Sequence, residues 1–127
     1  MGDDNITTKE IPFTQEMLNH TRNKNKIHTL RTKRYGNNGD ILKIHGTEEY
    51  IKFVSVQRIP IDIVADYLYK CEGCSSKDHF IATWERIHPE KGYCPQEKYW
   101  GHFYVYLGDE PDFIMGDVKK YAQSKLI

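Results

Sequence analysis

Three residues with reactive or charged side chains stand close together in the stretch KIHTLR, namely Lys26, Thr29 and Arg31. A threonine hydroxyl is inert at neutral pH and needs a base to take its proton before it can attack a carbonyl. A lysine amine is such a base when it is uncharged, which requires burial or a neighbouring cation to lower its pKa. Arg22, Lys24 and Arg31 supply positive charge nearby. The stretch therefore has residue types that suit nucleophilic chemistry, provided that the amine and the hydroxyl meet.

The spacing of Lys26 and Thr29 sets a geometric condition on this chemistry. Side chains three residues apart in a regular strand point to opposite faces, so both cannot reach one pocket from within a strand. Either Lys26 lies in the turn before the strand, or a bulge reverses the strand between them. The polar stretch TRNKN that precedes Ile27 favours the turn.

The elements that must position these residues follow from hydrophobic periodicity and capping patterns. Thr14 is a candidate N-cap for a short helix, and Pro60 opens a helical stretch in which Ile61, Val64 and Leu68 recur at helical spacing. Ser75 is the candidate cap of a further helix. The expected strands are 6–13, 27–32, 41–45, 50–59 and 100–107, the last helix is 76–87, and residues 114–127 form a short helix or stay loose. This order is an α+β pattern that fits a small, partly closed β-barrel flanked by two or three helices.

Composition limits the class of protein. The chain has 127 residues, 39% of them hydrophobic and 28% charged, which suits one folded domain spanning 1–127. No apolar stretch approaches the roughly 18 residues that cross a bilayer, and the N-terminus is polar, so we expect a cytoplasmic protein without membrane contact. Three cysteines make a disulfide framework an unfavourable interpretation.

The formal net charge of zero hides an uneven distribution. Residues 21–35 carry six Lys or Arg and no acid, whereas residues 60–112 hold ten Asp or Glu against five Lys or Arg. A basic segment of this kind suits a phosphate-bearing partner such as RNA, although six charges predict modest, salt-sensitive binding. The alternative is a solvated loop.

The order of several short motifs resembles the ASCH domain, a relative of the PUA-like RNA-binding barrels. The matching pieces are K-x-x-T-x-R at Lys26, Thr29 and Arg31, then Gly39-Asp40, then Glu72-Gly73, and then a helix with Phe80, Trp84, Ile87 and His88. The resemblance covers a core of about 6–107 and leaves 108–127 as a C-terminal extension.

Some small bacterial ASCH proteins are amidohydrolases that remove acetate from N4-acetylcytidine. Resemblance to them implies a threonine nucleophile, a lysine beside it and a glutamate, and Thr29, Lys26 and Glu72 occupy these positions. The chain departs from those enzymes by having His28 inside the motif and a cysteine on each side of Glu72-Gly73. These departures concern the substrate more than the fold.

The expected site has no metal or cofactor and takes a nucleoside or RNA. Glu72 is expected to protonate the departing amine, although its place before a helix start favours the ionised form through the helix dipole. Arg31, Lys33 and Arg34 are candidate substrate- or RNA-binding residues. Two hypotheses remain open: an amidohydrolase acting on an acylated pyrimidine nucleoside, and a non-catalytic RNA-binding module.

The cysteines allow one further interpretation. Cys71 and Cys74 form a Cys-x-x-Cys half-site, and Cys94 with His79 or His88 could complete a tetrahedral zinc set. The irregular spacing to the second half favours ordinary free thiols instead.

Overall fold

The fold is described by a computed structural model, which covers residues 9–110 of the chain. One five-stranded sheet in the order β1-β3-β4-β5-β2 is combined with three helices. The strands are β1 (Glu10–Ile11), β2 (His28–Arg31), β3 (Ile41–Ile44), β4 (Tyr50–Pro60) and β5 (Lys98–Gly108), and the helices are α1 (Gln15–Arg22), α2 (Ile61–Tyr67) and α3 (Lys77–Ile87). The predicted α+β class is confirmed.

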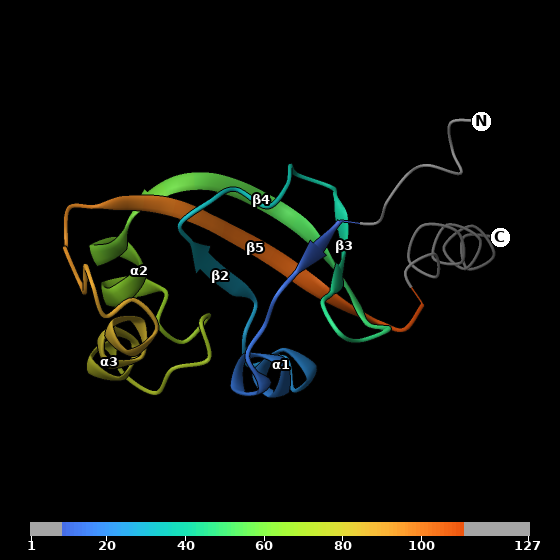
Figure 1. The fold of residues 1–127 in the computed structure, drawn as a ribbon, viewed down its shortest axis with the longest axis horizontal. Coiled ribbons are helices and arrows are strands. Elements are labelled where there is room, and N and C mark those ends of the chain that lie inside the picture. The colour runs from blue at the N-terminus through green and yellow to red at the C-terminus, as the bar shows by residue number, and fades with distance from the viewer. Residues whose placement is uncertain (1–8, 111–127) are drawn as a thin grey trace, which may run out of the picture.

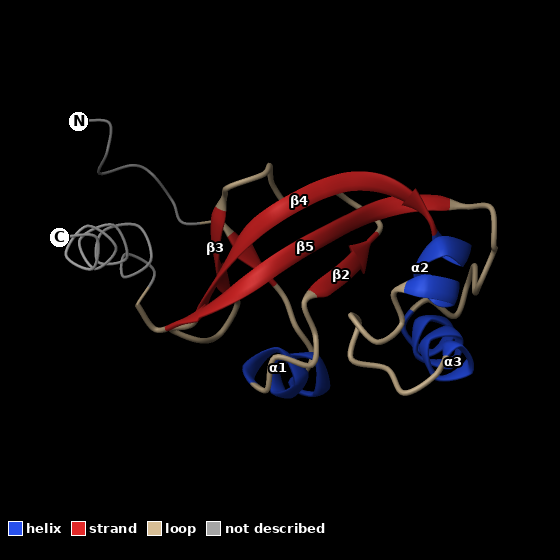
Figure 2. Ribbon diagram, turned by 180° about the vertical axis from the view of Figure 1, so that it is seen from behind, coloured by secondary structure: helices blue, strands red, loops and turns tan. Residues whose placement is uncertain are grey.

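Strands β4 and β5 form a long, curved antiparallel pair at the centre of the sheet, and all three helices lie on one side of this pair (Figures 1 and 2). The short strands β1 and β2 are the two edges of the sheet, so the sheet curls without closing. This arrangement confirms the prediction of a partly closed structure flanked by helices. None of the helices between residues 9 and 110 is long and apolar enough to cross a membrane.

The helix starts follow the sequence signals with one exception. Thr14 caps α1 by accepting the Met17 amide at 3.1 Å, and Pro60 is the N-cap position of α2. The assignment of Ser75 as the cap of α3 is wrong. Ser76 has the extended backbone of a cap and accepts the His79 amide at 3.0 Å, whereas Ser75 donates its own amide to the His79 ring.

The ends of the chain bear on two further predictions. Of the strand expected at 6–13, Glu10–Ile11 is a strand, and residues 6–8 lie outside the described part. The short or loose C-terminal helix also falls outside it. The division into a core and a C-terminal extension therefore stays a prediction.

The hydrophobic interior of residues 9–110 consists of two clusters. The first packs α1 against β1, β3, β4 and β5 and contains Ile11, Leu18, Leu42, Ile44, Ile51, Phe53 and Tyr104. The second packs α2 and α3 against β2 and β5 and contains Leu30, Ile61, Val64, Ala65, Phe80, Trp84 and Tyr99. Residues of α1, of β2 and the turn before it, and of α3 line one cavity between these elements.

Candidate active site

Lys26 lies in the turn that joins α1 to β2. The turn is tight, because Lys24 has a φ of 63° and the amides of Asn25 and Lys26 both donate to the His20 carbonyl, at 2.8 and 3.1 Å. Strand β2 begins only at His28. The turn explanation for the spacing of Lys26 and Thr29 is therefore confirmed, and alternation along a strand does not separate the two side chains.

Glu72 approaches Lys26 from the turn that follows α2. The Cys71 carbonyl accepts the amides of Ile27 at 2.8 Å and His28 at 3.1 Å, and Lys26 and Glu72 form an isolated β-bridge. These backbone contacts hold two segments together that are more than forty residues apart in the sequence.

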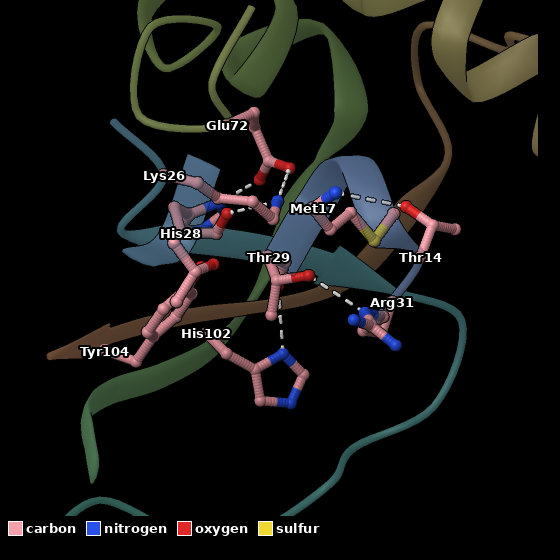
Figure 3. Close-up of polar contacts among 10 residues, drawn as sticks. Thr14, Met17, Lys26, His28, Thr29, Arg31, Glu72, His102 and Tyr104 are labelled. Carbon is pink, nitrogen blue, oxygen red and sulfur yellow. Dashed lines mark hydrogen bonds and ion pairs between the residues drawn. The ribbon is translucent and has the colours of Figure 1, made fainter. Parts of the chain in front are cut away.

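A buried ionic cluster forms where the two turns meet. The Lys26 amine donates to Glu72 Oε1 and to the His28 carbonyl, both at 2.8 Å, and His28 Nδ1 lies 2.5 Å from Glu72 Oε2 (Figure 3). The Lys26 and Glu72 side chains are only 2% and 8% exposed. Burial acts to raise the pKa of Glu72, but the charge of Lys26 and the bond from His28 outweigh it and lower the pKa below the usual value.

This cluster changes the expected role of Glu72. A carboxyl group whose pKa is lowered is ionised at neutral pH and is a poor proton donor. The ionised form of Glu72 was expected from the dipole of the following helix, but α3 begins only at Lys77. The cause is instead the pairing with Lys26 and His28. The Lys26 amine, which donates to this carboxylate, lines the cavity beside it.

Thr29 and Arg31 point to the same side of β2. The Thr29 side chain is buried, and its hydroxyl oxygen accepts the Arg31 Nε–H at 2.8 Å. The guanidinium lies over the rings of Phe13 and Tyr35, at 5.2 and 5.5 Å from their centroids. Burial lowers the Arg31 pKa, while the nearby Tyr35 and Glu72 favour the charged form. Arg31 Nη2 is buried and has no hydrogen-bond partner among the described residues.

The structure brings four predicted site residues to one cavity of about 210 Å³: Lys26, Thr29, Arg31 and Glu72 all line it. Its apolar walls include Met17 from α1 and Leu30, Phe80 and Trp84 from the second cluster. Cys74 also lines the cavity, but burial raises its pKa to about 11, so this thiol is not a ready nucleophile. A cavity this small suits a base-sized ligand, since drug-sized ligands occupy about 300–1,000 Å³.

Lys33 and Arg34 do not reach this cavity. Both are exposed, with Lys33 lying 4.7 Å from the Tyr35 ring centroid and Arg34 lying 5.0 Å from that of Trp100. Arg58, on β4, lies over the same Trp100 ring at 5.4 Å. The predicted binding residues thus divide into a half-buried one, Arg31, and an exposed pair, Lys33 and Arg34.

The basic segment 21–35 is not one continuous positive surface. Arg22 forms a bidentate ion pair with Glu49, through Nε at 2.7 Å and Nη2 at 2.5 Å, and Lys26 is buried against Glu72. Arg22 and Lys24 do not line the cavity. Of the three cations predicted to lie near Lys26, Arg31 is therefore the one that lines the cavity together with it.

Three histidines near the site were not assigned a role from the sequence. His28 holds Glu72, and its ring packs edge-on against Phe103 at 4.4 Å between centroids. His20 lines the cavity. His102, on β5, donates from Nδ1 to the Thr29 carbonyl and accepts the Tyr35 amide at Nε2, both at 3.1 Å. His102 lies on a strand in which apolar and polar residues alternate, and this pattern does not reveal that its partners are Thr29 and Tyr35, which are distant in the sequence.

His102 fixes the backbone on either side of Arg31, and its titration should make the fold acid-sensitive. Burial lowers its pKa from about 6.5 to about 4, and the charge of Arg31 acts in the same direction. Between these values the unfolded chain binds a proton that the folded chain does not, so stability falls as the pH drops from 6.5 toward 4. The expected loss is up to about 3 kcal/mol.

Urea unfolding at pH 7.0 and pH 4.5 measures this loss, and His102→Gln, which cannot titrate, should remove most of the difference. His45→Gln is the matched control because His45 is 71% exposed. Equal pH dependence in the wild type and His102→Gln would show that His102 is not responsible.

Cys71, Cys74 and Cys94 are free thiols. Within residues 9–110, no group of three or more His, Cys, Asp or Glu side chains is placed to hold a metal ion.

Comparisons with known proteins bear on the fold. No family model matches this sequence, and no curated protein matches it. A crystal structure of protein EF3133 from Enterococcus faecalis V583, described as DUF984, is similar with a TM-score of 0.61 at 9% identity, over 81% of this chain and 82% of that chain. An ASCH domain from Lactobacillus crispatus JV V101 is similar with a TM-score of 0.57 at 11% identity, over 84% of each chain. The chain therefore has the fold of an ASCH domain, as its motifs predicted.

Proposed function

With an ASCH-type fold established, we propose that this protein is an amidohydrolase that removes an acyl group from a pyrimidine nucleoside such as N4-acetylcytidine. The single observation that carries the proposal is the shared cavity: a threonine hydroxyl, a lysine amine and a carboxylate line one small space with apolar walls. Thr29 is the nucleophile in this proposal, Lys26 carries the proton, and Glu72 holds Lys26.

The first half of the reaction transfers the acyl group to Thr29. Because Lys26 rests as an ammonium paired with Glu72, it must first pass a proton to Glu72 along their 2.8 Å hydrogen bond. The neutral amine then takes the Thr29 proton while the hydroxyl oxygen attacks the acyl carbon. Lys26 gives this proton to the departing amine, and the C–N bond breaks to leave an acyl-threonine ester.

In the second half of the reaction, the neutral Lys26 amine takes a proton from water while the water oxygen attacks the ester carbon, and Lys26 returns this proton to the Thr29 oxygen as the ester C–O bond breaks. Acetic acid leaves and loses its proton to the solvent, which gives acetate and restores the Thr29 hydroxyl. The apolar walls favour both halves, because excluding bulk water reduces the cost of transferring the Lys26 proton to Glu72. The charge on Glu72 returns when the proton returns to Lys26, so no net proton is left on the protein.

Arg31 supports the acyl group in this scheme. Its Nε–H is already bonded to the Thr29 oxygen, and the neighbouring Nη2 has no partner. A guanidinium presents adjacent donors in a fixed fork, which matches two oxygens on one carbon. Once Thr29 attacks, the former carbonyl oxygen is on the same carbon as the Thr29 oxygen, where Nη2 can donate to its developing negative charge.

Incubation of the purified protein with N4-acetylcytidine tests the proposal, with acetate and cytidine measured separately. The expected result is equimolar release of both products by the wild type, with no added metal. Absence of turnover at any pH between 6 and 9 would overturn the proposal.

A second candidate function is the binding of single-stranded RNA, and the observation that favours it is the surface around Trp100. Two guanidinium groups, from Arg34 and Arg58, lie over this half-buried indole, and Lys33 lies over Tyr35 nearby. Exposed cations interleaved with aromatic rings are typical of surfaces that hold phosphates and stack bases. Tyr35 also lines the cavity, so this surface continues to its mouth.

Reversing two of these charges should weaken RNA binding. We expect the variant Arg34→Glu with Arg58→Glu to bind a single-stranded oligonucleotide at least about tenfold more weakly than the wild type, with a smaller dependence on salt. Lys70→Glu is the control, because Lys70 is an exposed lysine that follows α2. Fluorescence anisotropy at several salt concentrations measures both effects, and equal losses in the two variants would argue against a specific surface.

A further inference from the structure

His20 is a cavity residue that the proposed reaction does not use. It lies on α1, and its ring lines the cavity together with Lys26 and Glu72. Its Nδ1 atom is buried and has no hydrogen-bond partner among residues 9–110. Buried polar atoms in native proteins nearly always have a partner, so an unpaired one in a residue that lines a cavity points to an atom of the ligand.

The His20 ring is held in place rather than free to turn away. Gly73 lies directly against it: a Cβ atom at position 73 would be 3.1 Å from His20 Cγ and 3.2 Å from His20 Cβ. Gly73 also has a φ of +83°, a backbone conformation that residues with a side chain rarely adopt. The carbonyl of His20 accepts the amides of Asn25 and Lys26. The same residue therefore fixes the Lys26 turn and presents a ring to the cavity.

These contacts locate His20 relative to the proposed reaction. It adjoins Lys26 through its carbonyl and the Glu72-Gly73 turn through its ring. In the proposed reaction Lys26 protonates the departing amine, which places the leaving group at this end of the cavity. Arg31, bonded to the Thr29 oxygen, serves the acyl end. In the proposed reaction, the two residues with an unpaired buried nitrogen then lie at the two ends of one amide substrate.

We propose that His20 Nδ1 donates a hydrogen bond to the ring nitrogen that adjoins the acylated amine, and that His20 thereby selects nitrogen heterocycles as leaving groups. In a cytosine base this atom is N3, a lone-pair acceptor next to the carbon that carries the amine. The proposal deepens the proposed function and rests on it for the placement of the substrate. It makes His20 a specificity-determining residue, with no role in proton transfer.

Binding of cytidine and 3-deazacytidine, which carries a C–H in place of N3, tests this pairing. The expected result is that the wild type binds cytidine about 10- to 100-fold more tightly than 3-deazacytidine, and that His20→Leu binds the two equally. His20→Gln keeps a donor and should retain part of the preference, which separates recognition from a general loss of packing. A wild type that binds the two nucleosides equally, or that binds neither, would overturn the inference, as would a preference that persists in His20→Leu.

Turnover of N4-acetylcytidine and N4-acetyl-3-deazacytidine by the same proteins separates this inference from the proposed function. If neither compound is hydrolysed but the binding preference depends on His20, the recognition of the base stands and the amidohydrolase proposal falls. If the wild type hydrolyses and binds both series equally well, the amidohydrolase proposal stands and the role of His20 falls.

Discussion

Thr29→Val is expected to reduce acetate release from N4-acetylcytidine by at least about 1,000-fold, because the variant keeps the shape of the side chain and removes only the nucleophile. The fold should survive, since among residues 9–110 the hydroxyl bonds only to Arg31 Nε, and the Thr29 carbonyl still accepts the bond from His102 Nδ1. Circular dichroism and urea unfolding should therefore change much less than turnover.

The chain offers a matched control for this variant. Thr32 is exposed and also lines the cavity, one residue beyond β2. Thr32→Val makes the same chemical change and should leave turnover within a few-fold of the wild type. Mass spectrometry adds a direct test, because the wild type alone should accumulate an acyl adduct on the peptide that contains Thr29. Comparable turnover in Thr29→Val and the wild type would remove Thr29 from the mechanism.

The core of the candidate site could be predicted in part from local spacing, for Lys26 and Thr29, and in part from the order of the motifs, for Glu72. The polar TRNKN stretch indicated a turn before Ile27, and the structure places Lys26 in that turn. Glu72 was identified through the order of the motifs, and its β-bridge to Lys26 shows why such an order is informative: each motif supplies one side of the same contact.

The parts that could not be predicted depend on contacts between distant segments. Arg31 was grouped with Lys33 and Arg34, which are exposed, but the Arg31 guanidinium lies over the rings of Phe13 and Tyr35, and Phe13 comes from the distant segment between β1 and α1. Arg58 and Trp100 lie on neighbouring strands whose register no sequence pattern reveals. The Ser75 error is of another kind, since two adjacent serines can both cap and the backbone decides between them.

Glu72 connects the stability of the fold to the proposed chemistry, and Glu72→Ala should lower the free energy of unfolding by about 3–5 kcal/mol. Removing one partner of a buried ion pair leaves the other charge without compensation, and this loss is a large part of the 5–15 kcal/mol that stabilises a typical domain. Here Glu72→Ala leaves the buried Lys26 ammonium without its carboxylate partner and also removes the hydrogen-bond partner of His28. Urea unfolding at pH 7 measures the change.

An exposed ion pair supplies the control. Asp66 pairs with Lys77 at 2.6 Å, but their side chains are 39% and 51% exposed, so Asp66→Asn should change stability by less than about 0.5 kcal/mol. A loss below about 1 kcal/mol in Glu72→Ala would mean that the Lys26–Glu72 pair is open to water and that the cavity is not the dry site that the proton transfer requires.

The double variant Lys26→Met with Glu72→Gln separates the two roles of the pair. It removes both charges at similar volume, and the glutamine oxygen can still accept the bond from His28, so most of the lost stability should return. Turnover should not return, because no amine remains to take the Thr29 proton. A folded double variant that still releases acetate would show that Thr29 is activated by some other group. A double variant that is as stable as the wild type but inactive would show that the charged Lys26–Glu72 pair serves the reaction and does not add to the stability of the fold.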